Sequence, residues 1–325
     1  MSTNKTLETP AKIDGKEGGR MDAIIERQDG QRVHLADLGI IVLDIRIPAA
    51  TISSYGTNVP GRAGKVDKGS DYTGRTLEID LLKMGQDLMD FPFIRNQIHY
   101  YLGGKDWVWL YEGRSLGMCY EFEQPGQESV NPFEVDNDYI YGMRYKIRSQ
   151  GGFNVDQITK NGRATVTFDL IELPFAESTA TTLQPFILDT KDSVETQAIW
   201  TVDRAQLFDE IPVYTVKGSG EFRIYNGGTE EVDPDEGMYL VITHKGASDG
   251  LTIDNLTNGS RFKYLDSTKT ADYLVVNGTD VTKNNVNVVR RTEPSLLTLS
   301  EGWNRIKISN SSGGETSFDF RWYFR

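Results

Sequence analysis

The chain is poor in the residues that usually carry metal or redox chemistry. Its 325 residues include one cysteine, Cys119, and three histidines. One cysteine excludes a disulfide framework within the chain and a cysteine-based zinc site. Cys119 stands between Met118 and Tyr120 in an apolar run, so we expect a buried structural thiol rather than a nucleophile.

Long apolar runs are also missing. No stretch approaches the ~20 apolar residues of a membrane-spanning helix, so we expect no membrane insertion. Residues 1–20 are polar and lack the apolar segment of a signal peptide. They predict a disordered leader, and Met21 could serve as an alternative start.

Common catalytic motifs are not found. The sequence holds no Gly-x-Ser-x-Gly, no phosphate-binding lysine followed by Ser or Thr, and no His-Glu-x-x-His. We expect His34, His99 and His244 to be surface or structural residues, because none has a ligand at metal-binding spacing. Asp136-Asn-Asp138 lacks the glycine and distal glutamate of a calcium loop, which favours a solvated acidic loop. We therefore predict no catalytic residue, no cofactor and no metal.

The charge balance is acidic. The chain has 35 Lys and Arg against 47 Asp and Glu, a net charge of −12. Cut at Ala180, the first part holds 20 cations and 26 anions and the second 15 and 21, so each carries −6. This balance disfavours a surface that grips nucleic acid through its phosphates.

The first half reads as strands around one helix. The region from Asn58 to Asp80 is punctuated by glycines, which predicts a long surface loop that leads into an alternating strand, Arg75–Lys83. Apolar residues then recur at helical spacing over residues 90–102. We expect Asp90 to cap this helix, Pro92 to fit its first turn and Gly103-Gly104 to end it.

The second half has a different texture. The Ser/Thr-rich Ala176–Thr182 reads as a linker, and many short strands separated by Asn/Gly turns follow, which is typical of an antiparallel sandwich. The predicted fold class is mainly β, with one notable helix and two antiparallel β-sandwich domains. The predicted divisions are a leader (1–20), an N-terminal domain (21–178), a linker (179–196) and a C-terminal domain (197–325).

Several stretches resemble the distal tail protein (Dit) family of long-tailed, siphovirus-type phages. Pro60-Gly-Arg-Ala-Gly-Lys-Val-Asp67, followed by the strand that begins at Arg75, is similar to the family's Pro-Gly-x-x-Gly-x-x-Asp loop and strand. Thr165–Phe175 resembles the strand that closes the family's N-terminal domain. Three further stretches resemble its C-terminal half: Glu221–Pro234, Leu251–Gly259 and Gly302–Arg325.

The resemblance implies a structural protein of the virion, made in the host cytoplasm and placed at the distal end of the tail. It implies a homohexameric ring of N-terminal domains that joins the tail tube protein to the tail-associated or tail-fibre protein. The C-terminal domain would be a galectin-like β-sandwich that holds receptor-binding proteins, and DNA would pass through the ring without specific binding. The candidate ring-interface residues are Pro60, Gly61, Arg62, Gly64 and Asp67, with Arg62 and Asp67 as candidates for salt links within or between subunits.

A carbohydrate-binding module that acts directly on the host cell surface is the alternative. Trp303 is its candidate contact, for a cell-surface glycan or for a partner. Large aromatic side chains are mostly buried, so we favour core packing for Trp303. A hydrolase is the weakest interpretation, because no nucleophile and base occur in a recognisable arrangement.

Overall fold

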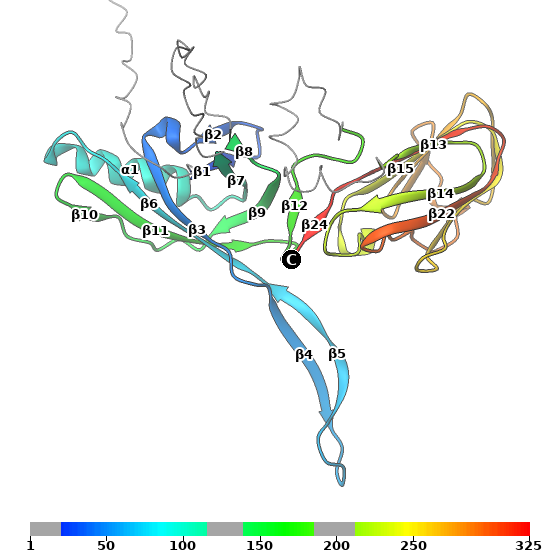
Figure 1. The fold of residues 1–325 in the computed structure, drawn as a ribbon, viewed down its shortest axis with the longest axis horizontal. Coiled ribbons are helices and arrows are strands. Elements are labelled where there is room, and N and C mark those ends of the chain that lie inside the picture. The colour runs from blue at the N-terminus through cyan, green and yellow to red at the C-terminus, as the bar shows by residue number, and fades with distance from the viewer. Residues whose placement is uncertain (1–20, 116–138, 185–211) are drawn as a thin grey trace, which may run out of the picture.

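A computed structural model describes residues 21–115, 139–184 and 212–325. Across these residues the chain is mainly β with one α-helix, and every pairing between its strands is antiparallel (Figure 1). The predicted fold class is therefore confirmed. The predicted leader lies outside the described residues, as do Cys119, Asp136–Asp138 and the strands expected at 117–122 and 198–202.

The N-terminal half is built on one large sheet. Its main path runs in the order β2 (Arg32–His34), β1 (Met21–Glu26), β7 (Val108–Ser115), β9 (Met143–Ser149), β11 (Asn161–Leu170), β6 (Thr76–Lys83), β3 (Ile40–Arg46). Short strands extend this path: β8 (Tyr139–Ile140), β10 (Asp156–Ile158), β12 (Ala176–Ser178) and β24 (Tyr323–Phe324). A short 3-10 turn, η1 (Ala36–Leu38), links β2 to β3.

One helix, α1 (Phe91–Leu102), packs on this sheet as the apolar spacing predicted. Ile94, Ile98 and Leu102 recur every four residues and are buried, so they form one face of the helix. Gly162 on β11 allows the close approach, because a Cβ there would lie 2.8 Å from the Ile94 side chain.

The predicted capping by Asp90 is wrong in detail. A 3-10 turn, η2 (Leu88–Asp90), precedes the helix, and the Asp90 carboxylate accepts hydrogen bonds from the backbone N–H groups of Gln86 and Asp87. The Asp87 carboxylate accepts in turn from Met89 at 2.6 Å. The Asp90 carboxylate thus takes part in the capping box of the 3-10 turn and makes no side-chain hydrogen bond to α1.

The C-terminal half is a pair of antiparallel sheets. One sheet runs in the order β13 (Thr215–Lys217), β23 (Glu315–Phe320), β15 (Leu240–Lys245), β19 (Tyr273–Asn277), β20 (Asp280–Lys283), β21 (Val286–Asn287). The other runs β14 (Gly220–Asn226), β22 (Gly302–Ser311), β16 (Ser248–Asn255), β17 (Arg261–Lys263), with β18 (Ser267–Thr268) beside β16. Two 3-10 turns lie between strands, η3 (Pro234–Glu236) and η4 (Val289–Arg291).

Buried asparagines hold one end of this sandwich. Asn255 donates to the Asn304 side-chain oxygen at 2.9 Å, and Asn226 donates to the Leu299 carbonyl at 3.2 Å. Asn255 also donates to the Thr298 carbonyl at 2.8 Å, so side-chain amides hold residues 296–299, whose sequence Leu-Leu-Thr-Leu predicts a strand. The segment makes only an isolated bridge, between Leu299 and Val232, because side-chain amides replace much of a strand ladder there.

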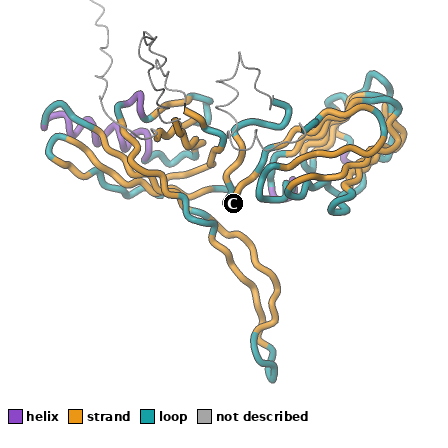
Figure 2. The backbone as a smooth tube through the Cα atoms, in the orientation of Figure 1, coloured by secondary structure: helices purple, strands orange, loops and turns teal. Residues whose placement is uncertain are grey.

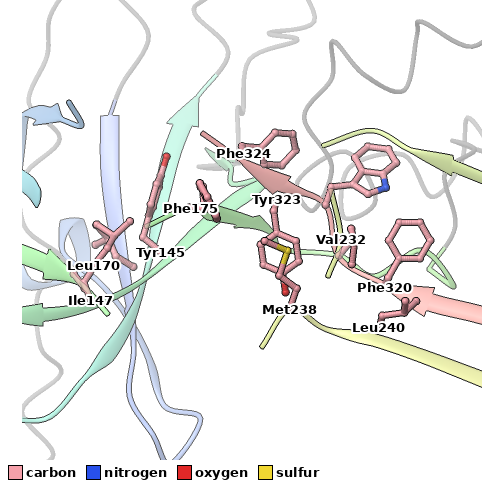
Figure 3. Packing of buried hydrophobic residues seen from close by; sticks show 14 of the residues in the cluster. Tyr145, Ile147, Leu170, Phe175, Val232, Met238, Leu240, Phe320, Tyr323 and Phe324 are labelled. Carbon is pink, nitrogen blue, oxygen red and sulfur yellow. The ribbon is translucent and has the colours of Figure 1, made fainter. Parts of the chain in front are cut away.

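The two halves meet through the last strand of the chain. β12 pairs with β9 of the N-terminal sheet on one side and with β24 on the other. Phe175, Tyr323 and Phe324 are buried at this junction beside residues of both halves (Figure 3). The predicted domain limits stay a prediction, but residues near Arg325 clearly complete the N-terminal sheet.

The linker expected at Ala176–Thr182 is wrong for its first part. Ala176–Ser178 is the strand β12, and both Ser178 and Thr182 are buried. The Thr182 hydroxyl donates to the Phe318 carbonyl at 2.9 Å and accepts from the Phe320 N–H at 3.1 Å. The Ser and Thr residues of this stretch suggested a linker, whereas here the hydroxyl groups of Ser178 and Thr182 form hydrogen bonds with backbone groups.

A carboxylate lies between two arginines at this junction. Glu177 on β12 contacts Arg144 of β9 and, at 3.6 Å, Arg321 just before β24. The side chains of all three residues are 13–17% exposed, and burial lowers the pKa of Arg321. The Glu177 charge therefore compensates two desolvated cations at once.

Replacing Glu177 with alanine should lower the free energy of unfolding by about 3 kcal/mol, because it leaves buried cations without their counter-charge. Urea unfolding measures the change. Glu172→Ala is the matched control, since Glu172 pairs with Lys146 but is 66% exposed, and it should cost less than about 1 kcal/mol. Equal effects of the two substitutions would contradict the role given to Glu177.

Candidate functional site: an exposed hairpin arm

A long two-stranded hairpin projects from the N-terminal sheet (Figures 1 and 2). It consists of β4 (Thr51–Asn58), a tip at residues 59–64 and β5 (Lys65–Gly74), and we call it the arm. The arm continues the β3–β6 hairpin beyond Pro48 and Arg75. Almost all of its residues are exposed, so contacts with the rest of the chain are confined to its base.

The arm corrects the expectation of a long surface loop before Arg75. Its strands lack a buried face, so they lack the apolar alternation by which strands are recognised. Their pairing rests on backbone hydrogen bonds, with irregular register between Ser54 and Gly56. An isolated hairpin of this kind is marginal in water, and the arm therefore depends on its base.

The base is held by several polar contacts. Arg75 donates to the Pro48 carbonyl at 2.6 Å. Arg46, at the end of β3, donates to Asp80 at 2.6 Å and to Glu78 at 3.0 Å. The hydrogen bond from Arg46 holds the pKa of Asp80 below its usual value. These bonds fix the direction in which both strands leave the sheet.

The base also contacts the C-terminal half. Tyr72 packs edge-on against Phe175, with ring centroids 5.4 Å apart. The Arg325 guanidinium lies 3.4 Å from the Tyr72 hydroxyl and forms an ion pair with Glu230. The arm is thus anchored where the two halves of the chain join.

All five candidate interface residues lie on the distal part of the arm. Pro60, Gly61, Arg62 and Gly64 form the tip, and Asp67 begins the return on β5. Gly61 and Gly64 have φ near +80°, a left-handed conformation that glycine adopts without strain. The predicted proximity of these residues follows from the hairpin, but their role at an interface stays a prediction.

A salt link between Arg62 and Asp67 is not formed within the chain. Among the described residues neither side chain takes part in an ion pair, and Asp67 accepts instead from the Gly69 N–H at 3.0 Å. Over residues 62–68 the arm carries three cations and one anion, a net charge of +2. The distal arm is therefore basic on an acidic chain.

Exposed apolar side chains accompany this charge. Ile52 is 58% exposed, and Tyr55 and Val59 are also exposed. They contact no core within the chain, so their exposure costs free energy that burial against a partner would recover.

Trp303, the candidate sugar contact, lies on the outer face of the C-terminal sandwich. It is half-buried on β22, opposite Tyr225 of β14, and the two rings are 5.1 Å apart. The Arg223 guanidinium lies over the indole, 4.3 Å from its centroid. Because a sugar would need the indole face that Arg223 covers, this geometry favours packing.

The histidines take structural positions. His34 lies 3.2 Å from the Asp22 carboxylate, whose pKa is raised by burial. His99 packs edge-on against Phe153, and buried His244 lies 2.9 Å from the Thr316 hydroxyl. In the part of the chain that the structure describes, no cluster of three or more His, Cys, Asp or Glu could hold a metal. No helix there is long and apolar enough to cross a membrane.

Sequence reasoning missed one further surface. α1 and the turn before it expose Met84, Leu88, Met89 and Phe93. The sequence predicts one apolar stripe from Leu88 to Leu102, which is wrong at Leu88, since that side chain is 63% exposed. Met89 and Phe93, which are also exposed, are four residues apart. This four-residue spacing was the signal in the sequence from which the exposed apolar surface could have been predicted.

Comparisons with known proteins define the class. Residues 28–170, which include the whole arm, match the family model of the phage tail protein RIFT-related domain. The N-terminal half is therefore similar to this phage tail protein domain over residues 28–170. A search of curated protein sequences finds no match.

The fold of the described residues is also similar to that of a distal tail protein. The Dit protein of phage SPP1 matches with a TM-score of 0.56 and 12% sequence identity, over 94% of this chain and 100% of that one. Its structure is described as a paradigm of the hub adsorption apparatus in phages that infect Gram-positive bacteria. A chain of the phage p2 baseplate in its activated conformation with Sr matches at 10% identity over 92% of this chain and 97% of that one. Its TM-score of 0.37 is too low to carry an argument.

Trp303→Ala should lower the free energy of unfolding by about 2 kcal/mol, less than for a fully buried tryptophan, with glycan-array binding unchanged. Urea unfolding and the array are the measurements. Arg305→Gln is the control, because Arg305 lies on the same face in an exposed pair with Glu221. Glycan binding that is lost on Trp303→Ala, with unfolding unchanged, would point to a sugar platform instead.

Proposed function

We propose that this chain is the distal tail protein of a siphovirus-type phage, a structural hub at the end of the tail. The observation that carries the proposal is the match of residues 28–170 to a phage tail protein domain. The fold shared with SPP1 Dit over 94% of the chain supports it. The role is structural, with no catalytic step.

In this proposal six copies form a ring through their N-terminal domains. A closed ring repeats one contact between two different surfaces of the same chain. The arm supplies one such surface, because it projects beyond the sheet and exposes both apolar and basic side chains. Pro60, Gly61, Arg62, Gly64 and Asp67 are its distal contacts.

The ring would join the tail tube protein on one side and the tail-associated or tail-fibre protein on the other, with receptor-binding proteins held by the C-terminal halves. DNA would pass through without specific binding. The net charge of −12 supports this, since an acidic wall offers few cations to exchange for counterions on DNA. Arg46, an exposed cation on the sheet, is already paired with Glu78.

A galectin-like C-terminal domain and direct glycan binding have less support. The C-terminal half is an antiparallel sandwich, but fold alone does not define a ligand. The guanidinium over Trp303 leaves no open stacking face on that side of the indole. We therefore favour receptor-binding proteins as the occupants of this half.

Light scattering of the purified chain over a concentration series tests the ring. The chain should reach six times the monomer mass, and Ile52→Ser/Tyr55→Ser should weaken assembly about 100-fold, the loss expected from two contacts at an interface centre. Its melting temperature should be unchanged, since both side chains are exposed.

Leu256→Ser/Leu265→Ser is the control, because these C-terminal residues are comparably exposed and should not affect assembly. A wild-type chain that stays monomeric at every concentration, alone and mixed with tail tube protein, would refute the hub.

A further inference from the structure

α1 buries one apolar face within the chain, but apolar side chains at its N-terminus stay exposed. Ile94, Ile98 and Leu102 face the sheet and are buried. Met89, in the turn before the helix, is 87% exposed, and Phe93, in its first turn, is 68% exposed. Leu88 and Met84, also exposed, adjoin them along the chain. We call these four residues the outer patch of α1.

The outer patch is unusual for a solvent-facing surface. Full burial of each such side chain is worth about 1.5–3 kcal/mol, and neighbouring exposed apolar residues mark interaction sites more often than plain surface. Methionine and phenylalanine are also enriched at protein interfaces. Among the described residues this is the densest run of exposed large apolar side chains, with four in the ten residues from 84 to 93.

Two carboxylates, those of Asp87 and Asp90, flank Met89. They outweigh the helix N-terminus, which contributes only about +0.5 of a charge. Lys160 lies 3.4 Å from the Gln86 carbonyl and Arg95 follows on the helix, so the negative charge is confined to the turn at residues 87–90. A partner with apolar side chains between cations would complement this surface.

The arm has that composition. Ile52 and Tyr55 are exposed on β4 and Val59 is exposed at the tip, and residues 62–68 carry the net +2 of Arg62, Lys65 and Lys68 against Asp67. β4 has eight residues, which at about 3.3 Å per residue spans about 26 Å. The arm is therefore long enough to lie across a neighbouring domain.

The two surfaces cannot meet within one molecule. α1 packs on the N-terminal sheet, whereas the arm leaves that sheet in the opposite direction (Figure 1). A contact between the arm and the outer patch must therefore join two copies. Such a contact is heterologous, so each copy uses its arm to bind one neighbour and its outer patch to bind the other.

We infer that the outer patch of α1 is the receptor for the arm of the neighbouring copy in the ring. Apolar residues of β4 lie on Met89 and Phe93, and the basic distal arm lies beside Asp87 and Asp90. This inference rests on the ring proposed above and names its second surface.

Photo-crosslinking tests it in the full chain. Phe93, which is 68% exposed and so has room for the added benzoyl group, is replaced with p-benzoylphenylalanine, and ¹⁴N- and ¹⁵N-labelled copies are mixed before assembly. After irradiation and trypsin digestion, position 93 should be joined to the peptide Ile47–Arg62, which holds Ile52, Tyr55 and Val59. Linked peptides of mixed isotope composition would show that the contact joins two copies.

The matched control places the same photo-reactive residue at Arg95, which is exposed on the same helix but outside the outer patch. Its yield of the Ile47–Arg62 product should be at least several-fold lower. In parallel, Met89→Ser/Phe93→Ser should weaken assembly about 100-fold with an unchanged melting temperature.

The outcomes separate this inference from the proposed function. A ring of six copies in which Phe93 joins another peptide, or in which Met89→Ser/Phe93→Ser assembles normally, overturns the inference and leaves the hub standing. The patch would then serve another tail protein. A chain that never assembles overturns both.

Discussion

The pairing of β12 with strands from both halves is the constraint on which the rest of the molecule depends. β12 is three residues long, yet it joins β9 to β24 and so completes the N-terminal sheet with the last residues of the chain. Within this contact the Glu177 carboxylate neutralises two mostly buried cations, Arg144 and Arg321. A polar group so placed is costly unless all its partners are present, which favours one relative arrangement of the halves over any other.

The arm is a second consequence of that junction. Its strands have no core of their own, and their order is inherited from β3 and β6 below. Tyr72 and Arg325 brace the base from opposite halves. A polar, glycine-containing arm can stay soluble as long as its apolar residues are few, and it can still bury them on assembly. A base held by these contacts under an exposed tip suits a contact made with a second molecule.

Elements that follow from a local residue pattern could be predicted from the sequence, whereas features that depend on contacts between distant residues could not. The helix at 91–102, the strand at 76–83 and the Asn/Gly-separated strands near 221–225 and 240–244 follow from spacing and turns. The arm was not predictable in the same way, because exposed polar strands carry no alternation. Ser178 and Thr182 looked like linker residues because their partners lie more than 130 positions away. For the candidate site, the family-like loop placed Pro60 to Asp67 together, but their projection on a hairpin needed the structure.

The position of Arg325 has a practical consequence for anyone who wishes to attach cargo to this protein. Its side chain is clamped by Glu230, by the Thr229 carbonyl and by Tyr72, in the angle between the arm and the sandwich. Anything fused after Arg325 would emerge into that angle and crowd the root of the arm. The Asn284-Asn285 turn, between β20 and β21 of the C-terminal sandwich, holds two residues already in the left-handed conformation of a tight turn. A displayed peptide or a fluorescent label inserted there would leave the assembly surfaces open.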